Sequence, residues 1–282
     1  MKIGKYTLHI IESGGLSLDG GAMFGIIPKP LWEKSNPADE KNRVKLFTRN
    51  LLLISDAKKV LIDTGMGLKW DEKSTEIYDI NLERDELVES LSKLSIAPSE
   101  ITDVLLTHLH FDHTGGSTKL DNGKLIPTFP NAKYHVQKRN FDWALNPSDK
   151  DKGSYIKDNF VPLAEFGVLN FLTEKDISFD EEIEILTING HTFGQQIFKI
   201  SDSTRTLLFS GDLLPFSSHI HLPYIMSYDL QPLVTLEEKK QILAKAVEES
   251  WILCFEHDPF FAMATVVRTK NGYNAHEKFN TF

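Results

Sequence analysis

The sequence predicts an α/β protein in which two β-sheets pack together and helices cover them from outside. Short runs rich in β-branched and aromatic residues occur in both halves of the 282-residue chain, and segments with helical periodicity interleave with them. No internal repeat, low-complexity tract or Pro/Ser-rich linker divides the chain. We therefore expect a single domain over residues 1–282.

Strands are expected where short apolar or alternating runs are bounded by turn-forming residues. In the first half of the chain these runs are Tyr6–Ile11, Lys45–Ile54, Val60–Asp63, Asp103–Thr107 and Tyr134–Val136. In the second half they are Ile183–Ile188, Gln196–Ile200, Thr206–Phe209 and Ile252–Glu256.

Helical periodicity is clearest over Glu83–Leu94, where apolar side chains share one face. A second helix is expected to begin at Thr235, because Thr235 and Glu238 match a capping box. The charged run Glu237–Lys240 is then expected to form a solvated helix face. Two further segments are also predicted to be helical, namely Arg139–Leu145 and Ser154–Phe166.

The composition favours a soluble protein that does not bind nucleic acid. The formal net charge is -9, whereas phosphate binding draws on clustered Lys and Arg. Cys254 is the only cysteine, so no intrachain disulfide can form and a reducing compartment fits. The sequence shows no signal-peptide pattern and no run of roughly 18 uncharged apolar residues. We therefore expect a cytoplasmic protein with no membrane partner.

The strongest functional pattern is the run Thr107–His113, which ends a predicted strand. His108 and His110 are two residues apart, and alternate side chains of an extended segment point to the same side. Two imidazoles can therefore converge on one metal ion, while Asp112 and His113 can serve a second ion. Surface histidines in a polar loop are the simpler interpretation, but this density of ligands after an apolar strand favours a metal site.

This run and four further motifs resemble the metallo-β-lactamase superfamily, whose signature is His-x-His-x-Asp-His. The four motifs follow in the family's order, as Asp63-Thr64-Gly65, Gly190-His191-Thr192, Gly211-Asp212 and Glu256-His257-Asp258. The resemblance implies a four-layer αβ/βα sandwich of two mixed β-sheets flanked by helices, with the site at one edge. It also implies two divalent metal ions, and a His/Asp ligand set suits zinc as well as manganese, iron or cobalt.

The resemblance implies a role for each matching residue. The implied metal ligands are His108, His110, Asp112, His113, His191, Asp212 and His257. His191 is expected on the first ion, His257 on the second and Asp212 between both, while Asp63 supports the site without binding metal. Several β-lactamases have cysteine or serine in place of Asp212, so antibiotic hydrolysis is not favoured.

Two neighbouring metal ions can share one water, lower its pKa towards neutrality and polarise a scissile carbonyl or phosphoryl oxygen. The expected reaction is attack of a metal-bridging hydroxide on an ester carbonyl, with Asp112 passing the proton to the leaving group. This chemistry cleaves esters, lactones, thioesters and phosphoesters, so the residues that line the pocket decide the substrate.

The segment Leu18–Gly25 resembles the N-terminal loop of the branch that contains N-acyl-homoserine lactonases and methyl-parathion-type hydrolases. In that branch an apolar loop lies beside the metals. Met23 and Phe24 are therefore candidate substrate-binding residues, with Phe47 a weaker candidate. Core packing is the alternative for these side chains, but the neighbouring glycines favour a loop.

One position departs from the lactonase pattern. Many N-acyl-homoserine lactonases have a tyrosine three residues after the bridging aspartate, where it contacts the substrate carbonyl, and this chain has Pro215. His219 and His221 in the same loop are candidate catalytic residues that donate a hydrogen bond to the substrate. The alternative is that both are solvated loop histidines.

The leading hypothesis is a lactonase that opens N-acyl homoserine lactones and so quenches quorum-sensing signals. The alternative is an organophosphate or aryl-ester hydrolase of the methyl-parathion-hydrolase type on the same metal site. A glyoxalase-II-type thioesterase and an RNA-processing enzyme are disfavoured, because the chain lacks the basic segments they need. A metal-free binding protein is disfavoured because every ligand position is filled. The expected partner is a small ester or lactone, and a homodimer is expected by analogy with the resembling branch.

Overall fold

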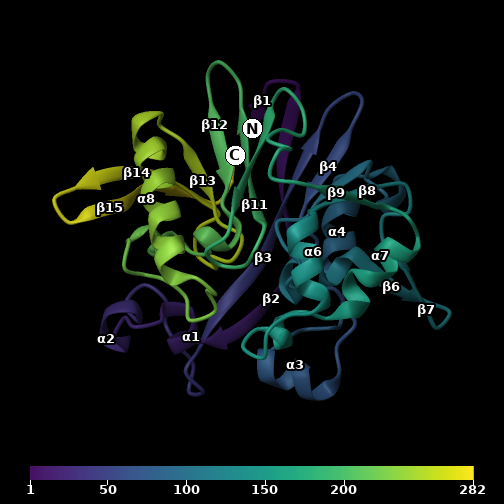
Figure 1. Cartoon of the computed structure of the whole chain (residues 1–282), viewed down its shortest axis with the longest axis horizontal. Helices are drawn as coiled ribbons and strands as arrows, with labels where there is room; N and C mark the ends of the chain where they lie inside the picture. The colour runs from purple at the N-terminus through teal and green to yellow at the C-terminus, as the bar shows by residue number, and fades with distance from the viewer. Residues whose placement is uncertain (282) are drawn as a thin grey trace.

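A computed structural model describes residues 1–281, in which two β-sheets face each other and helices lie outside both (Figure 1). The first sheet contains β1 (Lys2–Ile3), β2 (Tyr6–Asp19), β3 (Arg43–Ile54), β4 (Lys59–Ile62), β5 (Asp103–Leu105), β8 (Lys133–Gln137) and β9 (Leu169–Leu172). Its order is β1-β2-β3-β4-β5-β8-β9. The sheet is mixed, because β1 to β4 pair antiparallel and β4, β5, β8 and β9 pair parallel.

The second sheet is formed by strands that are consecutive in the sequence. They are β10 (Ile183–Ile188), β11 (Gln195–Ser201), β12 (Thr206–Phe209), β13 (Ile252–Cys254), β14 (Met263–Thr269) and β15 (Gly272–Phe279). Only the β12–β13 pairing in this sheet is parallel, and α8 lies in the connection between these two strands. A separate hairpin is formed by β6 (Thr118–Asp121) and β7 (Lys124–Pro127).

Helices pack on the outer face of each sheet. The first sheet is covered by α4 (Glu86–Lys93), α6 (Lys138–Leu145) and α7 (Val161–Glu165), and the second by α8 (Pro232–Glu248). In the outer layer of the second sheet, Leu243 of α8 and Leu253 of β13 belong to one apolar cluster. Between the sheets another cluster joins Leu105 of β5 to Phe198 of β11. The predicted four-layer αβ/βα sandwich is confirmed.

Four shorter helices complete the connections that matter for the site. They are α1 (Gly20–Phe24), α2 (Lys29–Trp32), α3 (Glu72–Tyr78) and α5 (Phe111–Thr114). In Figure 1, α1 and α2 lie side by side at the lower left and α3 lies apart from them at the lower right of centre, all at the end of the sheets away from β1. The segment Leu18–Gly25 is thus not simply the loop that was expected, because the Asp19 carboxylate caps a short helix by accepting a hydrogen bond from the Ala22 amide.

The predicted strands are present, but several ends differ. β2 runs to Asp19 rather than Ile11, because its later residues pair with β3 beyond a bulge between Glu12 and Gly15. Bulges bend a strand without ending its pairing, and alternation in the sequence does not continue through them.

Three helix predictions were wrong in their bounds. The helix expected over Glu83–Leu94 is shorter and runs over Glu86–Lys93. The helix expected from Thr235 begins at Pro232, so Thr235 lies inside the helix and does not cap it. The helix expected over Ser154–Phe166 is reduced to Val161–Glu165, preceded by a short 3-10 turn at Lys157–Asn159. Pro162 lies in the first turn of this helix, where the missing amide of proline is tolerated.

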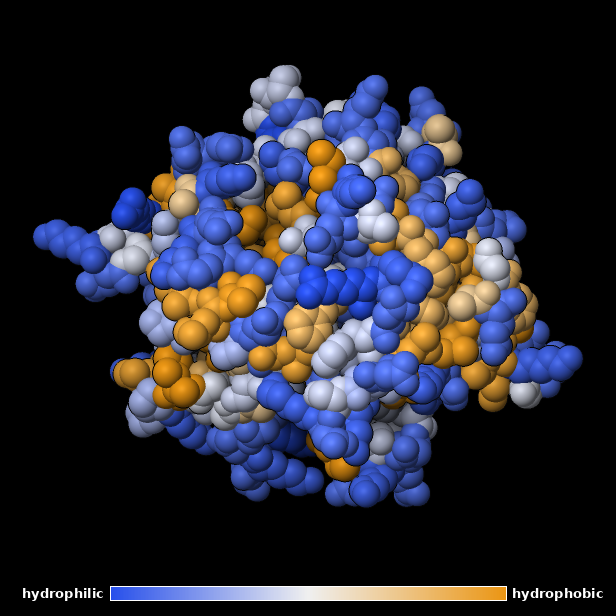
Figure 2. Space-filling model, viewed as in Figure 1, coloured by the Kyte–Doolittle hydropathy of each residue, from blue (hydrophilic) through white to orange (hydrophobic). Residues whose placement is uncertain are grey.

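The face shown in Figure 2 carries hydrophobic residues in separate patches among hydrophilic ones. Exposed apolar side chains of this kind are ordinary on globular proteins. Among the described residues 1–281, no helix is long and apolar enough to cross a membrane.

The packing between the sheets predicts the effect of a truncation. Phe198 is fully buried there, and Phe198→Ala is expected to lower the free energy of unfolding by about 3–5 kcal/mol because it leaves a cavity. Urea denaturation measures this change. Phe166→Ala, at a position that is 54% exposed, is the control and should change stability by less than about 0.5 kcal/mol. Equal losses in both variants would contradict the assigned core.

Candidate metal centre and its cavity

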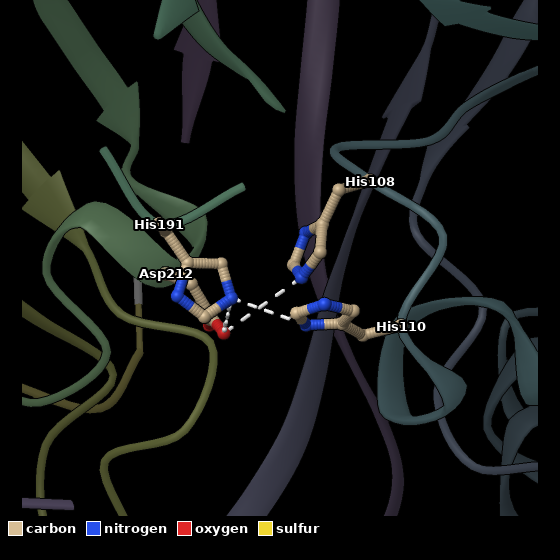
Figure 3. Close-up of side chains that lie close together, drawn as sticks. All are labelled: His108, His110, His191 and Asp212. Atoms are coloured by element: carbon tan, nitrogen blue, oxygen red, sulfur yellow. Dashed lines mark hydrogen bonds and ion pairs between the residues drawn. The ribbon is translucent and has the colours of Figure 1, made fainter. Parts of the chain in front are cut away.

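The first cluster of candidate ligands joins the two halves of the chain. His108 and His110 follow β5, His191 follows β10, and Asp212 follows β12. Their ligand atoms all lie within 4.8 Å of one another, and all four side chains are buried. Figure 3 shows the two histidines of the first half pointing towards His191 and Asp212 of the second half.

A second cluster lies beside the first and consists of Asp112, His113 and His257, whose ligand atoms are also within 4.8 Å of one another. Asp212 connects the two clusters. Its Oδ2 atom lies 3.1 Å from Nε2 of His191, and its Oδ1 atom lies 3.0 Å from Nε2 of His257 and 3.4 Å from Nε2 of His113. One carboxylate oxygen therefore faces each cluster.

These residues fit a pair of divalent cations. Among the described residues, the Nε2 atoms of His108 and His110 are buried without a hydrogen-bond partner, which is rare for polar atoms inside a protein. The Nε2 atoms of His113 and His257 face each other at 3.2 Å. Imidazole and carboxylate atoms that converge in this way can hold zinc, manganese, iron or cobalt.

The far sides of two imidazoles, those of His191 and His257, are held by other residues. The Nδ1 atom of His191 lies 2.8 Å from Oδ1 of Asp229, and Nδ1 of His257 lies 2.8 Å from the Phe47 carbonyl oxygen. Such contacts fix the orientation of a ligand and leave Nε2 to face the centre. Asp229 was not predicted from the sequence, because it belongs to none of the recognised motifs.

Asp63 also acts from outside the ligand set. Its carboxylate accepts hydrogen bonds from the amide and hydroxyl of Thr107, at 2.7 and 2.6 Å, and lies 3.1 Å from Nδ1 of His113. Oε2 of the buried Glu256 lies 3.1 Å from the same nitrogen. Gly115, two residues after His113, packs so closely on the Met66 carbonyl that a Cβ atom would collide with it.

Charges near the clusters move the pKa values of the histidines in opposite directions. Burial and the neighbouring imidazole of His113 hold the pKa of His108 well below its ordinary value. Burial also opposes charge on His191, but the carboxylates of Asp212 and Asp229 outweigh it and raise its pKa to about 9. Because metals bind neutral imidazole, metal binding by His191 would be coupled to proton release.

Helix α8 holds the loops on two sides of the centre. The Glu238 carboxylate accepts hydrogen bonds from the amides of Asn189 and Gly190, at 2.7 and 3.1 Å, just before His191. The fully buried Lys239 donates to the carbonyl oxygens of His221 and Tyr224, and burial lowers its pKa to about 7. Glu237–Lys240 is therefore not a wholly solvated face, as expected from the sequence, because two of its side chains turn inward.

A cavity of about 220 Å³ opens onto both clusters. Its lining includes His110, Asp112, His191, Asp212 and His257, together with Leu18, Met23, Leu46, Tyr78, Phe111, Lys150, Gly153, Ser154, Met226 and Tyr228. Two tyrosines, Tyr78 and Tyr228, line the cavity. Burial raises their pKa values, and nearby negative charge, including that of Asp112, raises them further.

Of the three predicted substrate-binding side chains, only Met23 lines this cavity. Phe24 is fully buried and stacks on Trp32 with 4.9 Å between ring centroids. Phe47 is also absent from the lining, whereas its neighbour Leu46 is present. Successive side chains of a strand point to opposite faces, so placing Leu46 in the cavity turns Phe47 away.

The structure does not bring His219 or His221 to the cavity. His219 is buried against Phe24, and its Nε2 atom lies 2.9 Å from the Met23 carbonyl oxygen. His221 lies in a separate surface cavity, lined also by Lys34. Sequence proximity to Asp212 suggested a role for both, but the turn after Pro215 directs them elsewhere.

The family model of the metallo-beta-lactamase superfamily matches residues 45–257. The chain belongs to this superfamily. As a member, it is a metal-dependent hydrolase, and the superfamily uses divalent metals.

Several known proteins resemble this superfamily member over most of its length. An N-acyl homoserine lactonase AttM from Agrobacterium fabrum is 24% identical, over 80% of this chain and 86% of its own length. A crystal structure of a probable metal-dependent hydrolase from Staphylococcus aureus is 28% identical, covers 99% of this chain and 98% of its own, and has a TM-score of 0.88. The dizinc quorum-quenching lactonase AidC is 20% identical, covers 100% of this chain and 97% of its own, and shares the fold with a TM-score of 0.81.

The contact between Asp229 and His191 predicts a change in metal affinity. Asp229→Ala removes the carboxylate that orients His191, and metal affinity is expected to fall about 10–100-fold. Competition with a chromogenic chelator measures the affinity. Asp149→Ala, which removes a carboxylate exposed to 98%, is the control. An unchanged affinity in Asp229→Ala would show that this contact does not position a ligand.

Proposed function

We propose that this hydrolase is a dinuclear-metal lactonase that opens N-acyl homoserine lactones. The observation that carries the proposal is the carboxylate of Asp212, with one oxygen towards each of two adjacent ligand clusters. The relatives named N-acyl homoserine lactonase, from Agrobacterium fabrum and Bacillus thuringiensis, support the choice of substrate.

In this proposal His108, His110 and His191 hold the first ion, and Asp112, His113 and His257 hold the second, with Asp212 shared. Zinc is the proposed metal, because a His/Asp set without cysteine suits it. Two such ions would lower the pKa of water towards neutrality and stabilise the negative charge that develops on the ester oxygen.

The protein's own residues supply orientation and proton transfer. Asp112 lines the cavity beside both clusters, so its carboxylate can take a proton from water and pass it to the leaving alcohol. Leu18, Met23, Leu46 and Met226 give the cavity an apolar wall that suits an acyl chain. The limited volume of about 220 Å³ favours substrates with short chains.

A second candidate is hydrolysis of aryl esters or organophosphates at the same site. The specific observation in its favour is the aromatic side of the cavity, where the rings of Tyr78 and Phe111 pack at 5.3 Å between centroids. Aromatic groups of a substrate stack well on such a surface.

Metal content tests the two-ion site directly. The chain loaded with zinc and freed of excess metal is expected to retain about two equivalents, because both clusters offer a sufficient set of ligands. His257→Ala is expected to retain about one, since it removes a ligand of the second ion only. Elemental analysis measures both values. A wild-type value near zero would contradict the proposal.

Hydrolysis of a short-chain and a long-chain N-acyl homoserine lactone by the metal-loaded enzyme, followed by pH-stat, tests the substrate. We expect rapid opening of the short-chain lactone, slower opening of the long-chain one, and none with His108→Ala as the blank. A phosphotriester and an aryl ester serve as parallel substrates. If lactones remain intact while one of these is cleaved, the lactonase proposal falls and the second candidate replaces it.

A further inference from the structure

Tyr228 lies in the loop before α8 and lines the cavity of the candidate metal centre. Its side chain is half-buried. Within residues 1–281 its hydroxyl makes no hydrogen bond, and the candidate ligand Asp112 lines the same cavity. A hydroxyl at the edge of a cavity, without a protein partner, is available to a ligand.

The backbone of Tyr228 is held firmly relative to the metal centre. Lys150 Nζ donates to the carbonyl oxygens of Ser227, Tyr228 and Asp229, at 2.9, 3.2 and 3.2 Å. The next residue, Asp229, contacts Nδ1 of His191 at 2.8 Å, and the Leu230 amide donates to the His191 carbonyl at 3.0 Å. The two residues after Tyr228 are therefore tied to the segment that carries the candidate ligand His191.

Tyr78, the other tyrosine of the cavity, is placed differently. It ends the short helix α3, none of whose residues is buried, and its ring packs edge-on against Trp70 at 5.9 Å between centroids. Its position depends on ring packing, whereas that of Tyr228 depends on the hydrogen bonds around His191. Precise positioning favours Tyr228 as the group that makes a directional contact.

We propose that the hydroxyl of Tyr228 donates a hydrogen bond to the carbonyl oxygen of the ester bound beside Asp112. Burial raises the pKa of Tyr228 above its ordinary value, so the phenol is protonated at neutral pH and can donate. Charge develops on this oxygen during attack, so a fixed donor stabilises the transition state more than the ground state. The loop before α8 thereby supplies the hydrogen-bond donor that the side chain of Pro215 cannot supply. This inference rests on the proposed ester hydrolysis.

The test compares Tyr228→Phe with Tyr224→Phe. Both variants remove one hydroxyl from the same loop and keep the ring, but Tyr224 packs against Phe24 and lines the separate surface cavity. We expect Tyr228→Phe to lower kcat for the short-chain lactone about 100-fold. KM should change little, and Tyr224→Phe should match the wild type. Metal content and Tm, measured on all three proteins, should stay unchanged.

Two results would overturn the role of Tyr228. One is a kcat in Tyr228→Phe equal to that of the wild type, and the other is a loss of activity that accompanies a loss of metal or a lower Tm. Failure of the lactonase proposal is distinguishable, because the wild type would then cleave only the aryl ester or the phosphotriester. The same comparison on the cleaved substrate then decides the role of Tyr228, since a phosphoryl oxygen accepts the same hydrogen bond.

Discussion

The dominant constraint on this structure is the convergence of buried imidazoles and carboxylates between its two halves. Polar atoms without partners are costly inside a protein, and among the described residues His108 and His110 each present such an atom beside the Asp212 carboxylate. Divalent cations bound between the ligands would relieve this cost and the mutual repulsion of the carboxylates. The surrounding chain then has to hold the ligands in place, which explains the hydrogen bonds on their far sides.

Holding the ligands depends on residues that are distant in sequence. Asp63 reaches His113 from the turn after β4, and Asp229 reaches His191 from the loop before α8. Helix α8 contributes twice, since Glu238 binds the backbone before His191 and Lys239 binds the backbone near Tyr224. A helix that packs on the outside of a sheet thus also sets the geometry of the cavity. Tyr228 lies between Tyr224 and Asp229, whose contacts with Lys239 and His191 hold this loop in place.

The cavity shows where local patterns stop being informative. Met23 and Phe24 are neighbours in an apolar segment, yet only Met23 reaches the cavity, because the helix α1 turns Phe24 onto Trp32. His219 appeared suitable for the substrate because it follows Asp212 closely, but it packs under Phe24 instead. Lys239 appeared solvated from its charge, although three backbone carbonyls accept its hydrogen bonds.

The sequence alone determined the layer architecture, most strand positions and the set of candidate ligands. The strand positions depend on local alternation, and spacing indicates which side chains of the run from His108 to His113 can converge. The four-layer order and the later ligands follow from the resemblance of short motifs to those of the superfamily. Tertiary structure decided the rest. Asp229, Glu238 and Tyr228 approach the centre through packing between elements far apart in the chain, and no local pattern records which residues such packing brings together.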